Sequence, residues 1–202
     1  MDPIVLILLA GIAVYTLKTQ DQRRRITLLG TQLQHYSLEK HIETLIEGYL
    51  RALGEDDADR REQIWGLMRA NETALGEQLE RLARDIAKLN AEATRVSKLA
   101  WAIPFADKLF PAATFDLRRA IDIHARGVAQ AIAEQPGRSE KDKAFTVMAE
   151  MYLFQHTCHW FCRSKNVASA RLLARHRTAY AQVLAAVTPD TRRAYEALVG
   201  KA

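Results

Sequence analysis

The sequence predicts an all-α protein with a single N-terminal transmembrane helix, a helical hairpin or coiled coil, and a C-terminal helical bundle. Nearly half of the 202 residues are apolar, and only nine are glycine and five proline. This composition suits long helices better than turn-rich β architecture. Apolar residues recur at three- and four-residue intervals through most of the chain, and no alternating run is long enough for a convincing strand. All five prolines fall at the boundaries of predicted helices, which supports the all-α assignment.

Residues 1–25 are predicted to form a membrane anchor followed by a basic stop. The run from Ile4 to Leu17 contains no charge, and Lys18 and the triplet Arg23-Arg24-Arg25 come after it. A helix of this length rises about 21 Å, which is short of the roughly 30 Å hydrocarbon core of a bilayer. Neighbouring threonines, a snorkelling Lys18 and local thinning of the bilayer can make up the difference.

Two alternatives compete with this anchor. A secretory signal peptide needs a basic segment before its apolar run and a small-residue cleavage site after it. Here Asp2 precedes the run and no Ala-x-Ala follows Val14, so cleavage is not expected. The run could also be the buried core helix of a soluble protein. As an anchor, with its basic residues on one side only, it places the N-terminus outside and the body of the protein in the cytoplasm.

Residues 26–98 are predicted to form the helical hairpin or coiled coil. The first helix is expected over 26–53, ending at Gly54, and the acidic cluster of residues 55–59 favours the start of the next helix. That helix carries a heptad seam with one polar intrusion: Trp65, Met68, Glu72, Leu75, Leu79, Leu82, Ile86, Leu89, Ala93, Val96 and Ala100. The seam suits packing on residues 26–53, which we slightly favour, or self-association. Candidate partner-binding residues on it are Leu75, Leu79, Leu82, Ile86 and Leu89.

Residues 99–113, which we call the elbow, differ from the rest of the chain. Pro104 and Pro111 interrupt regular helix, and Trp101, Phe105 and Phe110 lie around them. The simplest interpretation is a hydrophobic segment buried against the bundle. The alternative is a segment that enters the membrane interface or a partner's groove, where aromatic side chains are favoured, and the three aromatics are therefore candidate partner-binding residues.

Residues 114–202 are predicted to form the helical bundle. We expect a helix over 114–133, a turn at 135–138, and a long helix that starts at Ser139 with Asp142 completing a variant capping box. Residues 144–162 are apolar on nearly every side, as in the central helix of a bundle. A kink is expected around 164–166, a continuing helix over 167–187, and a last helix that starts at Thr188-Pro189 and ends at Val199.

The charge of the chain is concentrated at its C-terminal end. The net charge is +5, and the residues from Arg163 onward include eight basic and two acidic side chains. Such an excess favours an anionic partner, namely membrane lipid, an acidic protein face or nucleic acid, although it is equally typical of a solvated surface. Nucleic acid is possible but not favoured for a membrane-tethered protein. The candidate anionic-surface-binding residues are Arg171, Arg175, Arg177, Arg192 and Arg193.

The sequence contains one cluster with ligand-like composition. Cys158, His159 and Cys162 would share one face of a helix and are weak candidates for metal ligands. Their spacing matches no zinc-finger or thioredoxin-type pattern, and buried cysteine is usually a small core hydrophobe. No glycine-rich nucleotide motif is present. We therefore predict no catalytic residue, no cofactor and no enzymatic activity, and the two cysteines suit a reducing cytoplasm.

The layout of short anchor, basic stop and helical cytoplasmic body resembles that of many small bacterial inner-membrane accessory proteins, without any family motif. We expect a membrane-anchored cytoplasmic scaffold or adaptor that binds a protein partner, or a second copy, through helical surfaces. One alternative is a metal- or thiol-dependent sensor or enzyme that uses the Cys158, His159 and Cys162 cluster. The other is a membrane-tethered module that binds nucleic acid or anionic lipid.

Overall fold

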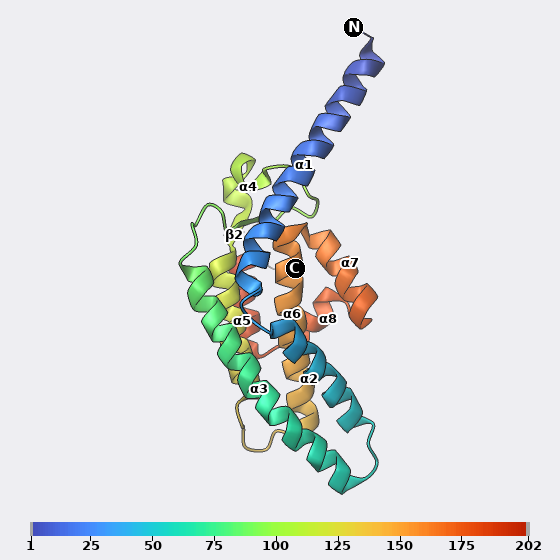
Figure 1. Cartoon of the computed structure of the whole chain (residues 1–202), viewed down its shortest axis with the longest axis vertical. Coiled ribbons are helices and arrows are strands. Elements are labelled where there is room, and N and C mark those ends of the chain that lie inside the picture. Colours follow the sequence, from blue (N-terminus) through green and yellow to red (C-terminus); the bar gives the residue numbers. More distant parts are fainter. Residues whose placement is uncertain (1, 201–202) are drawn as a thin grey trace.

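The apolar run and the residues after it form one continuous helix that extends out of a helical body (Figure 1). The computed structural model describes residues 2–200. Within them the chain forms nine α-helices, one short 3-10 helix and a two-stranded ribbon, which confirms the all-α prediction. In chain order the elements are α1 Pro3–Leu33, α2 Leu38–Leu53, α3 Ala58–Ala87, β1 Arg95–Ser97, α4 Ala106–Leu109, η1 Pro111–Ala113, β2 Thr114–Asp116, α5 Leu117–Ile132, α6 Glu140–Cys162, α7 Lys165–His176, α8 Tyr180–Ala186 and α9 Pro189–Val199.

The prediction of one helix over 26–53 is wrong, because the chain turns at residues 34–37 between α1 and α2. Side chains of α3 stabilise this turn: Gln78 Oε1 accepts a hydrogen bond from the Ser37 backbone at 2.7 Å, and Tyr36 donates to Asp85 at 2.6 Å. The apolar spacing continues through the turn, so the local pattern does not reveal it. The turn lets α2 pack along α3 while α1 points away.

The second predicted helix ends earlier than its heptad pattern suggests. α3 stops at Ala87, and Asn90 Oδ1 accepts hydrogen bonds from the backbone of Glu92 and Ala93 in a tight turn. Val96 then lies in β1, which pairs antiparallel with β2 at the register Val96↔Phe115. The sequence analysis did not predict this two-stranded ribbon. Each strand has only three residues, too few for a period-two pattern to stand out.

The helix predicted over 167–187 is also divided. Arg177 adopts a left-handed conformation with φ 54° and ends α7, and α8 begins at Tyr180. The kink expected at 164–166 is a complete break between α6 and α7, where Ser164 Oγ accepts a hydrogen bond from Val167 and caps α7.

Several predicted helix boundaries are confirmed. α2 ends at Gly54, and Asp57 of the acidic cluster caps α3 by accepting a hydrogen bond from the Arg60 backbone at 2.8 Å. Ser139 caps α6 through the Asp142 backbone, and Thr188 caps α9 with Pro189 in its first turn.

The centre of the body is α6, as its apolar composition predicts. It packs against α5, α7, α8, α2 and the inner part of α1. One contiguous cluster of buried side chains runs from Leu29 in α1 to Val199 in α9. The segments 26–98 and 114–202 therefore share a single hydrophobic core, with α3 packed on both α2 and α5.

Candidate functional site

The two halves of α1 have opposite environments. Every side chain of the outer half, Pro3–Leu17, is exposed, and contact with the body begins at Lys18. The outer half is apolar on all faces, whereas the inner half, Lys18–Leu33, buries Gln22 and Leu29 against the body. Among residues 2–200, α1 is the one helix long and apolar enough to cross a membrane.

Arg25 fixes the inner half of α1 to the elbow. Its Nη2 donates a hydrogen bond to Asp107 Oδ1 at 2.8 Å, and its Nη1 donates to the Arg95 carbonyl at the same distance. On the same face of the helix, Gln22 Oε1 accepts a hydrogen bond from Arg163 at 2.5 Å. A helix that is free along its outer half is thus held firmly in its inner half.

The elbow is not buried against the bundle, so the simpler interpretation of its sequence is wrong. Trp101 is 74% exposed, and Phe110 also faces solvent, while Phe105 is half-buried. Two aliphatic side chains that the sequence analysis did not single out, Ile103 and Leu109, are exposed beside them. The elbow therefore presents a small apolar surface.

The heptad seam is occupied within the chain. Between α2, α3 and α5, Leu89 is half-buried and four of the candidate partner-binding residues are fully buried, namely Leu75, Leu79, Leu82 and Ile86. The structure thus shows the intramolecular alternative. In the folded chain these four side chains are closed to a partner, because the chain itself covers them.

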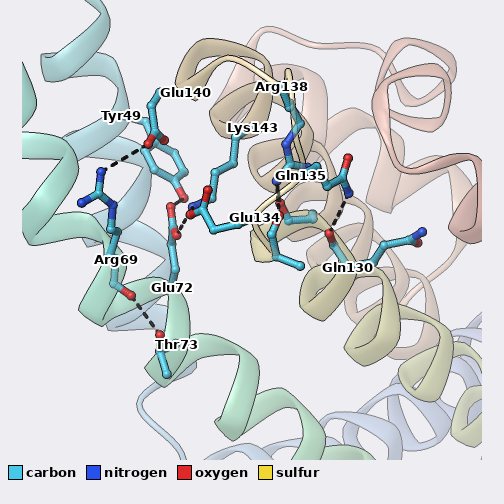
Figure 2. Close-up of polar contacts among 12 residues, drawn as sticks. Tyr49, Arg69, Glu72, Thr73, Gln130, Glu134, Gln135, Arg138, Glu140 and Lys143 are labelled. Atoms are coloured by element: carbon cyan, nitrogen blue, oxygen red, sulfur yellow. Dashed lines mark hydrogen bonds and ion pairs between the residues drawn. The ribbon is translucent and has the colours of Figure 1, made fainter.

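The polar intrusion in the seam is explained by a buried ion pair at the end of the body remote from α1. Glu72 Oε2 lies 2.6 Å from Lys143 Nζ of α6, and Glu72 Oε1 accepts a hydrogen bond from the Tyr49 hydroxyl at 2.7 Å. Lys143 also reaches Glu134 at 3.3 Å (Figure 2). Burial alone would lower the Lys143 pKa, but the hydrogen bonds and charges of Glu72 and Glu134 raise it above its ordinary value. These contacts join α2, α3 and α6.

An open groove runs between α2, α6 and α7, and we call it the α7 groove. It consists of two adjoining hollows of about 550 and 380 Å³ that share Glu39, Gln155, His159 and Arg175. Its apolar floor comes from all three helices and includes Leu38, Ile42, Phe154 and Leu172, each of which exposes only a small edge, at most 4% of its surface. The groove also brings together two of the predicted anionic-surface-binding residues, Arg171 and Arg175.

The electrostatics of the α7 groove are dominated by its two arginines. Arg175 pairs with Glu43 at 2.6 Å, whereas Arg171 forms no ion pair within residues 2–200 and donates to His159 Nδ1 at 3.2 Å. Burial and the nearby arginine charges lower the pKa of His159, so its imidazole is neutral at pH 7 and accepts that hydrogen bond. The groove therefore combines apolar contacts with one uncompensated guanidinium.

The remaining predicted cationic residues lie elsewhere. Arg177 caps the end of α7, and Arg192 and Arg193 lie on α9, which packs against α5 and β2. Arg192 pairs with Glu196 and Arg193 with Asp190 on their own helix. The five arginines thus do not form one continuous patch.

The cysteine cluster has the environment of core side chains. Burial raises the pKa of the Cys158 thiol far above its usual value and that of Cys162 to about 11, so both are protonated at neutral pH. His159 is directed at Arg171. In the part of the chain that the structure describes, no three His, Cys, Asp or Glu side chains are placed to hold a metal ion.

A buried polar network between α5, α6 and α9 was not anticipated. Tyr195 and the Nε2–H of His124 both donate to the Thr157 hydroxyl, which itself donates to the Leu153 carbonyl. Burial lowers the pKa of His124 to about 3, so its ring is neutral. The sequence gives no signal for this network, because histidine, threonine and tyrosine are common residues. Only packing between distant segments brings these three together.

Glu150 is a buried acid that the sequence analysis did not single out. Its Oε1 accepts a hydrogen bond from the Thr188 backbone at 2.9 Å, at the start of α9. Burial raises its pKa to about 7, although the hydrogen bonds from Thr188 and Thr191 act in the opposite direction. Gly127 leaves the space for this carboxylate, since a Cβ there would lie 2.5 Å from Glu150 Oε2. The arrangement caps α9 and joins three helices.

Comparison of the chain with protein-family models, curated proteins and solved structures gives no match. Its function is therefore inferred from its own residues and their geometry.

Proposed function

We propose that this protein is a single-pass, membrane-anchored adaptor whose helical body holds a protein partner at the cytoplasmic face of the bacterial inner membrane. The observation that carries the proposal is the outer half of α1, which is apolar on all faces and whose side chains are all exposed. An isolated helix this short is marginal in water. In a bilayer its backbone groups remain paired and its side chains leave water.

The contacts inside α1 suit a lipid environment. Thr16 and Thr19 donate their hydroxyl protons to the carbonyls of Ala13 and Tyr15, at 2.8 and 2.9 Å. Because these hydroxyls are satisfied within the helix, the span can extend as far as Thr19. Residues 3–19 rise about 25 Å, which leaves only a modest mismatch with the hydrocarbon core.

The orientation follows from charge. Lys18, Arg23 and Arg24 lie where the helix reaches the body, and the latter two are exposed. Basic residues next to a span remain on the cytoplasmic side. The body of the protein would accordingly lie in the cytoplasm.

The α7 groove is the surface we propose for the partner. It combines an apolar lining with Arg171, which no acidic side chain of the described residues neutralises. An amphipathic helix with an acidic residue beside its apolar face would complement both features. The partner chemistry is thus a short acidic, amphipathic segment.

The anchor is tested by extracting membranes at alkaline pH and comparing two leucine substitutions in the full chain. Leu9→Arg places a charge within the span, at a cost of about 3 kcal/mol, and should release much of the chain from the membrane. Leu173→Arg, at an exposed site on α7, is the matched control and should remain embedded. Release of the unmodified chain by alkali would contradict the anchor.

The partner surface is tested by site-specific photo-crosslinking from the α7 groove in native membranes, followed by charge reversal. Arg171→Glu should abolish the crosslink, and a partner variant with a lysine at the crosslinked acidic position should restore it. Arg192→Glu on α9 is the control and should have no effect. Equal crosslinking by the Arg171→Glu chain would exclude the groove as the binding surface.

A further inference from the structure

The elbow places its exposed apolar side chains in one short segment of the body. Four large apolar residues, Trp101, Ile103, Leu109 and Phe110, face solvent there, and Leu109 is 63% exposed. The other exposed large apolar side chains of the body are distributed over α1, α2, α3, α6 and α7. A local group of this kind, containing tryptophan and phenylalanine, marks a contact surface.

The elbow is held in a defined position. The ribbon closes its base, with the Lys98 backbone donating to the Ala113 carbonyl at 2.8 Å, and the Asn166 backbone donates to the Ala100 carbonyl at 3.2 Å. Asp107 is tied to Arg25 of α1 at 2.8 Å. The position of the elbow relative to α1 is therefore set by contacts with α1, the ribbon and the start of α7.

The elbow lies at the level where the apolar run of α1 ends. Lys18 and Gln22 of α1 line the same small cavity as Trp101 and Ile103. Figure 1 shows α4 and the adjacent loops beside α1, at the end of the body from which the outer half emerges. If α1 spans a bilayer up to Lys18, the elbow meets the headgroup region of the same leaflet.

The charges around the elbow suit an anionic lipid surface. Lys98 immediately precedes the elbow and Lys108 lies within it, with Lys108 Nζ 5.6 Å from the centre of the Phe105 ring. The nearby carboxylates of Asp21 and Asp107 are both paired with Arg25. The remaining local charge is mainly positive, and each basic residue near an anionic leaflet is attracted to it.

We propose that the elbow is a second membrane-binding element, which inserts Trp101, Ile103, Leu109 and Phe110 at the boundary between headgroups and acyl chains. Its occupant is the lipid of the leaflet that α1 crosses, because the elbow lies against α1 at Lys18, directly after the apolar run, and has Lys98 and Lys108 beside its apolar side chains. Tryptophan and phenylalanine are favoured at this depth. Contact at two points fixes the orientation of the body, whereas a single helix leaves it free to rotate about the span. This inference rests on the proposed anchor.

The test is fluorescence quenching by brominated lipid in the full chain, reconstituted into vesicles of phosphatidylcholine and phosphatidylglycerol. Comparing the unmodified chain with Trp101→Phe isolates the contribution of Trp101. We expect Trp101 emission to be quenched, more strongly by bromine near the headgroup end of the acyl chain than by bromine near its terminal methyl. Trp65→Phe is the control and should leave the amount of emission lost to quenching unchanged, because Trp65 is buried in the first half of α3.

The two hypotheses fail in different ways. A chain that does not float with the vesicles overturns the anchor, and the inference about the elbow with it. A chain that floats, but in which Trp101→Phe leaves the quenching unchanged, retains the anchor and overturns insertion of the elbow. That second result would be expected if the elbow docked on a protein partner or on a second copy. Because Trp101 is exposed, its substitution should not unfold the chain, and circular dichroism of both variants checks this.

Discussion

The two ends of the body use similar buried ion pairs but present different surfaces. At the proximal end, from which the outer half of α1 emerges, Arg25 and Asp107 join α1 to the elbow, with side chains 13% and 11% exposed. At the remote end, Lys143 and Glu72 join α6 to α3, with side chains 5% and 6% exposed. The proximal pair supports an exposed apolar surface, whereas beyond the remote pair lies the acidic cluster 55–59. A similar buried pair thus lies beneath an exposed apolar segment at one end and near an acidic cluster at the other, and under our proposal the first of these ends faces lipid.

The largest expected effect is the loss of the more deeply buried pair. Lys143→Met leaves the Glu72 carboxylate without its cation, and should lower the free energy of unfolding by about 3–5 kcal/mol. Thermal unfolding of both chains in detergent measures this loss of stability. The exposed neighbour Lys141→Met is the control and should change stability by less than about 0.5 kcal/mol. Equal effects of the two substitutions would contradict the structural role of the pair. Adding Glu72→Leu to Lys143→Met should recover much of the loss.

The next effect depends on pH and concerns Glu150, which lies between the two ends. Its pKa in the folded chain is about 7, above its ordinary value, so between about pH 4.5 and 7 the folded chain holds a proton that the unfolded chain has released. Ionising this buried carboxylate lowers the free energy of unfolding. The loss is absent below about pH 4.5, grows as pH rises, and is complete above about pH 7, where it reaches roughly 3 kcal/mol. Glu150→Gln, which stays uncharged, should gain stability relative to the unmodified chain by up to this amount as pH rises through that window.

Urea unfolding of both chains across this pH range measures the Glu150 effect. The contributions of His124 and His156, whose pKa values burial lowers to about 3, are common to both chains and cancel in the difference. A difference that does not change with pH would mean that Glu150 ionises normally in the folded chain.

A smaller effect is expected at the proximal pair. Arg25→Ala leaves Asp107 and the Arg95 carbonyl without their donor, which should cost about 2 kcal/mol. Hydrogen exchange should quicken in residues 99–113 and remain unchanged around Glu72. Arg24→Ala, whose side chain is exposed, is the control. Faster exchange at both ends would indicate global destabilisation instead of local release of the elbow.

The smallest effect on folding is expected at the elbow surface. Trp101→Ser should change the free energy of unfolding in detergent by less than about 0.5 kcal/mol, because the side chain contributes little to the core. Thermal unfolding measures this change. A loss above about 1 kcal/mol would show that Trp101 stabilises the body directly. It would then contradict the view that the elbow is a surface for contact and not part of the core.

Much of the fold follows from local patterns. Helix-capping residues such as Asp57, Ser139 and Thr188 mark true helix starts, because each supplies a side-chain acceptor to unpaired backbone N–H groups. The all-round apolar pattern of residues 144–162 identifies the central helix. By contrast, the breaks at 34–37 and 177–179 and the two short strands are missed, because hydrogen bonds and packing between remote segments override the local spacing there.

The candidate surfaces were predictable only in part. The sequence alone determined an unbroken apolar run with basic residues after it, an aromatic elbow and an excess of C-terminal arginines. Only the tertiary structure decided that the heptad seam is closed by α2 and α5, that the elbow faces outward, and that Arg171 lines a groove whereas Arg192 pairs with Glu196 on α9. The physical reason is that hydrophobicity establishes that a side chain gains from leaving water. Which surface covers it depends on segments far away in the chain.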